Sequence, residues 1–202
     1  MATRQTAEAG AHAAGETGED GVGRRVWSWI TTVDHKRIGI LYGVTALVFF
    51  LIGGIEALLI RAQLIQPGLD VLGADAYNQV FTMHGITMIF LVAMPAAVAL
   101  FNYVVPLQIG ARDVAFPRLN ALSYWIFLFG GIFMHVSLLL GVAPDGGWFG
   151  YVPLTTADYS PGPGADFYAL GLQILGIASI MGGVNFITTV INLRAPGMKL
   201  MR

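Results

Sequence analysis

The sequence contains no cysteine and little charge. Of its 202 residues, 11% are charged and 55% are hydrophobic, whereas a soluble domain carries roughly 25% charged residues. The lack of cysteine excludes disulfides and thiolate metal sites. The few charges crowd the first 37 residues and the connecting segments, which leaves long uncharged apolar runs. The composition therefore indicates an all-α integral membrane protein with several spans.

The N-terminal segment lacks the features of a targeting sequence. Residues 1–23 have neither the apolar core of a signal peptide nor the Arg-rich composition of a transit peptide. They bury too little apolar area to fold, so we predict a disordered cytoplasmic tail in which His12 has no role. Residues 24–37 combine tryptophans with basic residues, which is typical of a segment at the membrane interface and makes His35 an interface residue.

Four apolar runs predict four transmembrane helices. Each is long enough, at about 1.5 Å per residue, to cross a hydrocarbon core of about 30 Å. Pro95 is expected to kink the second helix. Pairs of glycine are expected to mark packing faces, because small residues let helices approach closely in lipid. The helices are predicted at residues 38–60, 79–104, 119–140 and 167–193, with the glycine pairs at 53–54, 130–131 and 182–183.

The basic residues are distributed unequally between the two sides of these spans. Of the 11 Lys and Arg residues, only Arg61 falls on the side opposite the N-terminus. Cytoplasmic loops carry an excess of Lys and Arg. Both termini are therefore predicted to face the cytoplasm.

His84 lies inside a long run without charge, and Gly85 follows it directly. An ionisable side chain within a membrane is costly and needs a partner or a function. Neutral imidazole is a common metal ligand, and a glycine leaves room for a large flat group beside the backbone. A histidine that bonds a neighbouring helix explains the pattern equally well, so from the residues alone both interpretations stay open.

The polar residues of the spans fall into two zones when they are placed by depth at about 1.5 Å per residue. The outer zone contains His84, His135, Arg61 and Gln173. The inner zone could order a file of water beneath a proton-collecting carboxylate, or it could provide ordinary hydrogen bonds between helices. It contains Asn102, Asp113, Asn120 and a predicted stripe of Asn185, Thr188, Thr189 and Asn192.

Several segments together resemble subunit I of the haem–copper oxidases, of the cytochrome c oxidase kind. The resemblance runs in order from about Trp27 to the C-terminus. The segments that carry it are WSWITTVDHKRIGILY, LLIRAQLIQPG, FTMHGITMIF, NYVVPLQIGARDVAFPRLNALSYW, GWFGYVPL and SIMGGVNFITTVINL.

The resemblance implies a role for individual residues. His84 of FTMHG would be an axial ligand of the low-spin haem, of a or b type, with Arg61 beside its polar edge and Trp148 among the residues that contact it. Asp113 of GARDVAFPR would be the entrance of a proton pathway. The residues implied to line that pathway are Asn102, Asn120, Asn185, Tyr42 and Ser179.

The sequence also departs from the family pattern. Gln63 stands where many relatives carry a cation-binding glutamate, and Ala178–Ser179 stands where relatives often have two serines. His135 is not expected from the pattern. The family fold has twelve spans, so the region 24–202 is expected to be the N-terminal part of subunit I. The ligands of the high-spin haem and of copper would come from later helices.

The function implied is part of a terminal oxidase in a prokaryotic inner membrane, with cytochrome c or quinol as electron donor. The expected partners are membrane lipid, the remaining helices of subunit I, and subunits II and III, without nucleic acid. Two alternatives remain. One is a small electron carrier in which His84 and His135 clamp one haem b, and the other is a non-catalytic assembly subunit.

Overall fold

The computed structural model describes residues 19–199 of the chain and divides it into two units, Met1–Thr32 and Val33–Arg202. In the first unit, helix α2 spans Glu19–Ile30. Residues 1–18 of the predicted disordered tail lie outside the described residues, whereas residues 19–23 form the beginning of α2 rather than part of a tail.

Helix α2 is amphipathic. Val22, Val26 and Ile30 are spaced by four residues and therefore share one face, and all three are exposed. Trp27 is exposed as well. An apolar face on a helix that also carries Arg24 and Arg25 is typical of a helix at a membrane surface.

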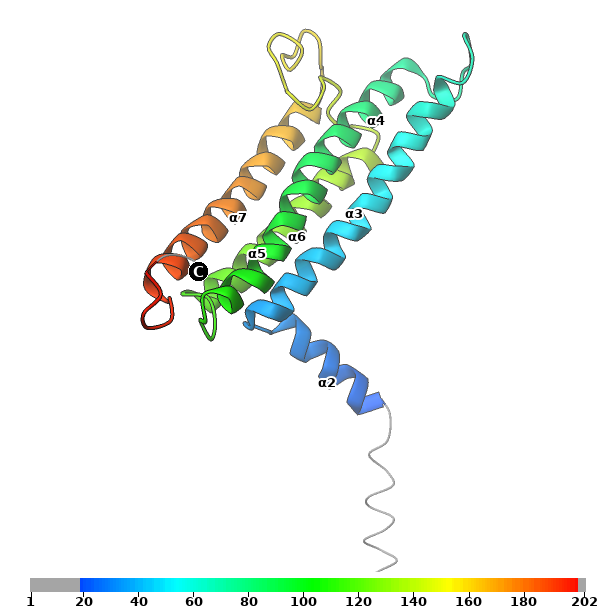
Figure 1. Ribbon diagram of the computed structural model, residues 1–202. Coiled ribbons are helices and arrows are strands. Elements are labelled where there is room, and N and C mark those ends of the chain that lie inside the picture. Colours follow the sequence, from blue (N-terminus) through cyan, green and yellow to red (C-terminus); the bar gives the residue numbers. More distant parts are fainter. Residues whose placement is uncertain (1–18, 200–202) are drawn as a thin grey trace, which may run out of the picture. The chain divides into compact units, whose positions relative to one another are not determined.

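The second unit is an antiparallel helical bundle (Figure 1). Four continuous helical rods in it are long and apolar enough to cross a membrane, which confirms the predicted fold class. The first rod is α3 (His35–Gln63), and the second joins α4 (Ala74–Ile86), the π-helical segment η1 (Thr87–Ala93) and α5 (Met94–Gln108). The third is α6 (Pro117–Leu139) and the fourth is α7 (Gly164–Asn192).

Helix α3 begins at a side-chain cap. Asp34 Oδ1 accepts hydrogen bonds from the backbone N–H groups of Lys36 at 2.8 Å and Arg37 at 3.2 Å. Partial burial raises the pKa of Asp34, but these two hydrogen bonds and the neighbouring positive charges outweigh it and hold the pKa below its ordinary value. The cap extends α3 by three residues beyond the predicted start at residue 38.

The second rod accommodates its prolines without a break. The widened turns of η1 end at Ala93, directly before the helix that contains Pro95 at its start. Because proline has no N–H to donate, such turns take up the missing bond. The second helix was predicted to end at residue 104, but α5 continues to Gln108 with Pro106 buried inside it. Membrane helices tolerate a proline whose freed backbone groups find other partners.

Some of the predicted glycine contacts are present and others are absent. A Cβ atom placed on Gly53 would lie 2.8 Å from Met88 Sδ, and one on Gly131 would lie 2.7 Å from the Phe49 ring. Gly130 is similarly close to Ile174 of α7. The glycine pair of α7 was predicted to pack, but a Cβ there would meet nothing within 4 Å, because this part of α7 borders a cavity.

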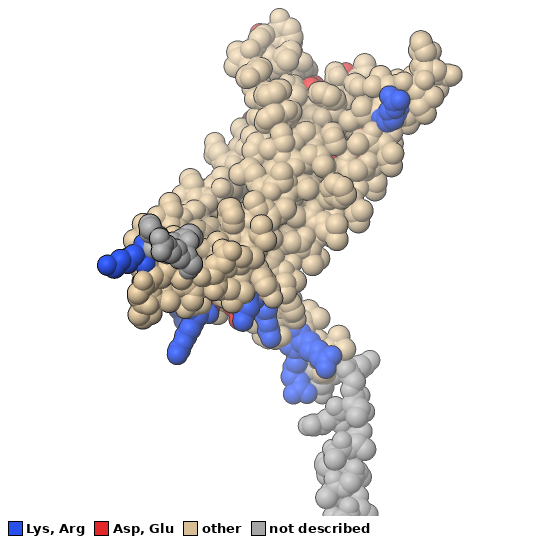
Figure 2. Space-filling model, viewed as in Figure 1, with Lys and Arg blue, Asp and Glu red and all other residues tan. Residues whose placement is uncertain are grey.

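Basic side chains of the bundle gather mainly at one end (Figure 2). Arg61 occupies the last turn of α3. The others in the described part of the bundle lie at the start of α3, in the loop between α5 and α6, at the start of α6 and after α7. They are Lys36, Arg37, Arg112, Arg118, Arg194 and Lys199. The alternating direction of the rods therefore places them opposite Arg61.

Candidate functional site

His84 presents one ring nitrogen away from the bundle. It lies in the last turn of α4 and is half-buried. Its Nδ1 atom is 2.9 Å from the carbonyl oxygen of Gly53 on α3. Since a carbonyl can only accept, Nδ1 donates and carries the proton, which leaves a lone pair on Nε2. In metal-binding histidines, such a bond from the ring nitrogen that does not bind the metal fixes the tautomer and the orientation of the imidazole.

The space beside Gly85 is filled by protein. A Cβ atom added to Gly85 would lie 2.9 Å from the Cβ and Cδ1 atoms of Trp148. The large flat group that this glycine admits in the structure is therefore the indole of Trp148. Trp148 belongs to the long loop after α6, and the backbone N–H of Gly147 bonds the buried hydroxyl of Thr82 at 2.9 Å. The loop is thus held against α4.

Arg61 and Gln63 lie close together in sequence, but Arg61 is exposed whereas the side chain of Gln63 hydrogen-bonds the following loop. Arg61 is exposed at the outer end of α3, eight residues and therefore about 12 Å along the helix from Gly53. The amide of Gln63 ties down the following loop, because its Oε1 accepts from the N–H groups of Val71 at 2.9 Å and Leu72 at 2.8 Å. Its Nε2 donates to the Leu69 carbonyl at 2.5 Å. An amide whose donor already serves a carbonyl does not fit a cation site.

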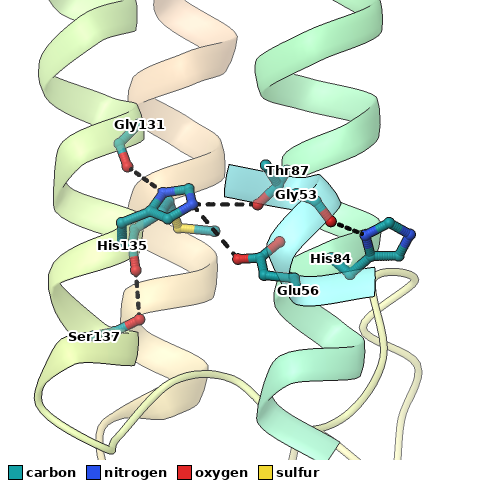
Figure 3. Close-up of polar contacts among 8 residues, drawn as sticks. Gly53, Glu56, His84, Thr87, Gly131, His135 and Ser137 are labelled. Atoms are coloured by element: carbon teal, nitrogen blue, oxygen red, sulfur yellow. Dashed lines mark hydrogen bonds and ion pairs between the residues drawn. The ribbon is translucent and has the colours of Figure 1, made fainter. Parts of the chain in front are cut away.

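His84 and His135 do not face one another. Figure 3 shows their rings on opposite sides of the turn of α3 that carries Gly53 and Glu56. His135 Nε2 is 3.3 Å from the hydroxyl of Thr87 and 3.7 Å from Glu56 Oε1. A haem clamped between the two histidines has no support in this geometry.

The inner zone is a connected set of buried polar side chains. Asn120 Nδ2 donates to Asn102 Oδ1 at 2.7 Å, and the hydroxyl of Ser123 donates to the Asn120 carbonyl at 2.8 Å. The same serine hydroxyl lies 3.1 Å from the hydroxyl of Tyr42. All four residues are nearly inaccessible to solvent. The predicted residues Asn102, Asn120 and Tyr42 are thus brought together, and Ser123 is a further member that sequence reasoning missed.

Asn185 holds the loop that carries Asp113. Its side-chain oxygen accepts from the N–H of Phe116 at 2.8 Å, and its side-chain nitrogen donates to the carbonyl of the same residue at 3.2 Å. Thr189 accepts from the N–H of Ala115 at 2.8 Å. Asp113 is half-buried at the mouth of this loop, where its Oδ1 accepts from the N–H of Val114 at 2.7 Å.

The predicted stripe on α7 is only partly present. Asn185 and Thr189 are buried in the bundle. Thr188 returns its hydroxyl to the Val184 carbonyl, and Asn192 is exposed. The stripe is narrower than predicted because only the i, i+4 pair points at the loop before α6.

Ser179 lies apart from the asparagines. With Tyr42 it lines a largely apolar cavity of about 500 Å³ between α5 and α7. Two of the predicted pathway residues therefore meet at one cavity.

His35 is not an interface residue. It is 1% exposed, and its Nδ1 donates to the backbone carbonyl of Asn102 at 2.7 Å. The prediction failed because the first turn of α3 faces α5, which the sequence alone does not reveal. Its position in the bundle links the first two rods next to the inner zone.

The fold and these sites define a class of protein. Four helices long and apolar enough to span a membrane hold an oriented imidazole at their surface and a buried set of amides and hydroxyls at the opposite end, so this is a multi-span membrane protein. Residues 37–202 match the model of the family described as cytochrome c and quinol oxidase polypeptide I. The chain belongs to this family.

Individual relatives agree with that assignment. The chain is 58% identical over 180 residues to cytochrome c oxidase subunit 1 of Bacillus subtilis (strain 168). The match covers 89% of this chain and 29% of the relative. It is 51% identical over 178 residues to quinol oxidase subunit 1 of Bacillus spizizenii, and this match covers 88% of the chain and 27% of the relative. It is 50% identical over 181 residues to the putative cytochrome c oxidase subunit 1-beta of Streptomyces avermitilis, and this match covers 89% of the chain and 32% of the relative. The chain therefore spans about a third or less of the length of these relatives.

Proposed function

We propose that this chain is the N-terminal part of the catalytic subunit of a terminal oxidase. The complete subunit would reduce O2 to water with electrons from cytochrome c or a quinol and couple this reaction to proton pumping. The observation that carries the proposal is the hydrogen bond from His84 Nδ1 to the Gly53 carbonyl, which leaves Nε2 free and oriented in a chain of this family.

The residues present fit one axial position of a low-spin haem. His84 would bind the iron through Nε2, and Arg61 at the outer end of α3 would face the charged edge of the group. Trp148 would lie beside it, fixed by its contact with Gly85. When bound, a low-spin haem supplies one-electron transfer. The high-spin haem and copper would be held by later helices of the complete subunit.

The inner zone fits a route for protons. Asp113 is the ionisable group at its mouth, and the groups beyond it are amides and hydroxyls that both donate and accept hydrogen bonds. Asn120 Oδ1 is buried and has no hydrogen-bond partner in the described part of the chain. A buried unpaired acceptor is a position that favours ordered water. The proposed route runs past Asn102 and Asn120 to Tyr42, and through the adjoining cavity to Ser179.

The proposed setting is the inner membrane of a prokaryotic cell, with both termini in the cytoplasm. The rest of subunit I, subunits II and III, membrane lipid and the electron donor would be the partners. Most of the exposed side chains of α7 are large and apolar, which suits contact with lipid or with further helices. These include Leu170, Ile177, Ile180, Val184, Ile187 and Ile191.

The function is tested with the complete subunit, expressed with its partner subunits and purified. We expect a haemochrome spectrum, and O2 uptake with either reduced cytochrome c or a quinol. Uptake with one donor and not the other identifies the donor. A preparation that binds no haem and consumes no O2 would contradict the proposal and favour an assembly role.

The orientation is tested with reporter fusions to this chain. A fusion after Lys199 should report a cytoplasmic position, and an insertion between Asp145 and Ser160 should report the opposite side. The physical reason is that basic loops resist translocation. The reverse pattern would show that the distribution of Lys and Arg does not orient this protein.

A further inference from the structure

The outer half of the bundle contains a buried carboxyl group that the proposed function does not use. Glu56 on α3 is 3% exposed and is the only buried acidic residue in the described part of the chain. Neither of its side-chain oxygens has a hydrogen-bond partner there. An isolated carboxylate in such surroundings is very costly, whereas the protonated acid is neutral.

A hydrogen-bond acceptor stands opposite this carboxyl. His135 Nδ1 is 2.9 Å from the Gly131 carbonyl, so Nδ1 carries the proton and Nε2 has the lone pair. Nε2 lies 3.7 Å from Glu56 Oε1 and 3.3 Å from Thr87 Oγ1. Figure 3 shows the carboxyl and the hydroxyl directed at this nitrogen from α3 and η1.

The surroundings isolate this group of three residues. The Phe49 ring lies over the imidazole, with ring centroids 5.1 Å apart. Met83, Ile86 and Met134 are fully buried in the adjoining apolar cluster. A small polar cavity of about 110 Å³ is lined by other residues, among them Gln79, Asp145 and Ser160.

Other ionisable groups on the same elements do not pair with Glu56. His84 points to the other side of α3 (Figure 3), and its ring nitrogen is bonded to Gly53. Arg61 is five residues further along α3 and is exposed. Asp75 lies in the first turn of α4, twelve residues or about 18 Å before Thr87. A single proton between Glu56 and His135 therefore keeps the group neutral.

We propose that Glu56, His135 and Thr87 form a proton-binding site within the membrane, in which the Glu56 carboxyl carries a proton and His135 Nε2 is its acceptor. When the proton moves, the O–H bond of Glu56 breaks and an N–H bond forms at Nε2. The products are a carboxylate and an imidazolium, so the net charge is unchanged and no other reactant is needed. Thr87 competes for Nε2 by donating its hydroxyl, and the π-helical turns that begin at Thr87 place it there.

This site is distinct from the proposed inner route and does not depend on haem binding. Thr87 precedes Asn102 by fifteen residues, which corresponds to about 22 Å along the second rod. The site lies in the outer half, on the far side of the bundle from Asp113. It would hold a proton separately from the inner route.

The test is infrared spectroscopy of the complete subunit in detergent. The spectrum of each variant is subtracted from that of the wild type, and the C=O stretch of protonated carboxyl groups is compared. Glu56→Gln keeps the size and polarity of the side chain, and we expect it to remove one such band. His135→Asn should keep the band but shift it to higher frequency, because the acid loses its strong acceptor. Thr87→Val should shift it to lower frequency, because the competing donor is gone. Each variant must elute as wild type in size-exclusion chromatography.

Two results would overturn the proposal. An unchanged carboxyl region in Glu56→Gln would show that Glu56 holds no proton, and an unchanged frequency in His135→Asn would show that the imidazole is not its acceptor. Neither readout involves haem or O2. A subunit that lacks oxidase activity but shows these bands would therefore contradict the proposed function and leave the proton site supported.

Discussion

Replacing His84 by alanine should remove the low-spin haem from the complete subunit. Nε2 of His84 is the proposed iron ligand, and the hydrogen bond from Nδ1 to the Gly53 carbonyl fixes its orientation. Losing groups that merely orient a ligand typically costs about 10–100-fold in metal affinity. Loss of the ligand itself should lower haem retention by at least about tenfold on that scale. The measurement is the Soret and α-band absorbance per protein, with haem content from the pyridine haemochrome.

His135→Ala is the matched control for this experiment. It removes an imidazole at similar depth that bonds Thr87 and approaches Glu56 instead of facing outward. We expect the low-spin bands to remain in this variant. If His135→Ala abolishes those bands while His84→Ala retains them, the assignment of the iron ligand is wrong.

The transmembrane rods could be predicted from the sequence because their cause is local. Long runs without charge have few alternatives in a membrane, and all four predicted spans are present. Their ends were harder to predict, because they depend on caps and on residues outside the apolar core. Asp34 extends α3 at its start, and α5 continues through Pro106 to Gln108.

The contacts within the site depend on how each rod is rotated about its axis, which single residues do not reveal. Depth placed Asn102 and Asn120 in one zone, and the structure brings them into direct contact. Depth also placed His84 and His135 at the same level, yet they face opposite sides of α3. The sequence places Glu56 in an apolar span, but it does not reveal that His135 of α6 and Thr87 of η1 lie next to it.

Gly85 illustrates the same limit. A glycine after an intramembrane histidine indicates that a bulky group approaches the backbone. The sequence contains no signal that this group is Trp148, more than sixty residues later in the chain. The contact depends on the path of an irregular loop, which is held at Thr82. The signal for close approach was correct, whereas the identity of the approaching group required the fold.

Replacing Asp113 by asparagine in the complete enzyme should slow turnover and abolish proton pumping. Asp113 lies at the mouth of the inner zone, and the amides and hydroxyls beyond it do not ionise at neutral pH. Asparagine keeps the shape of the side chain and an oxygen that accepts from the Val114 N–H, a bond of 2.7 Å in the structure. The loop should therefore keep its fold while the group that collects protons is lost.

The measurements are O2 uptake and the acidification produced by vesicles that contain the enzyme. The haem spectrum should be unchanged, since Asp113 lies at the opposite end of the bundle from His84. Asn185→Ala is a useful comparison, because it removes both hydrogen bonds to Phe116 and releases the same loop. We expect that variant to lose pumping together with stability, whereas Asp113→Asn should lose pumping at an unchanged unfolding temperature. Wild-type numbers of protons pumped per electron in Asp113→Asn would reduce Asp113 to a solvated acid of the loop.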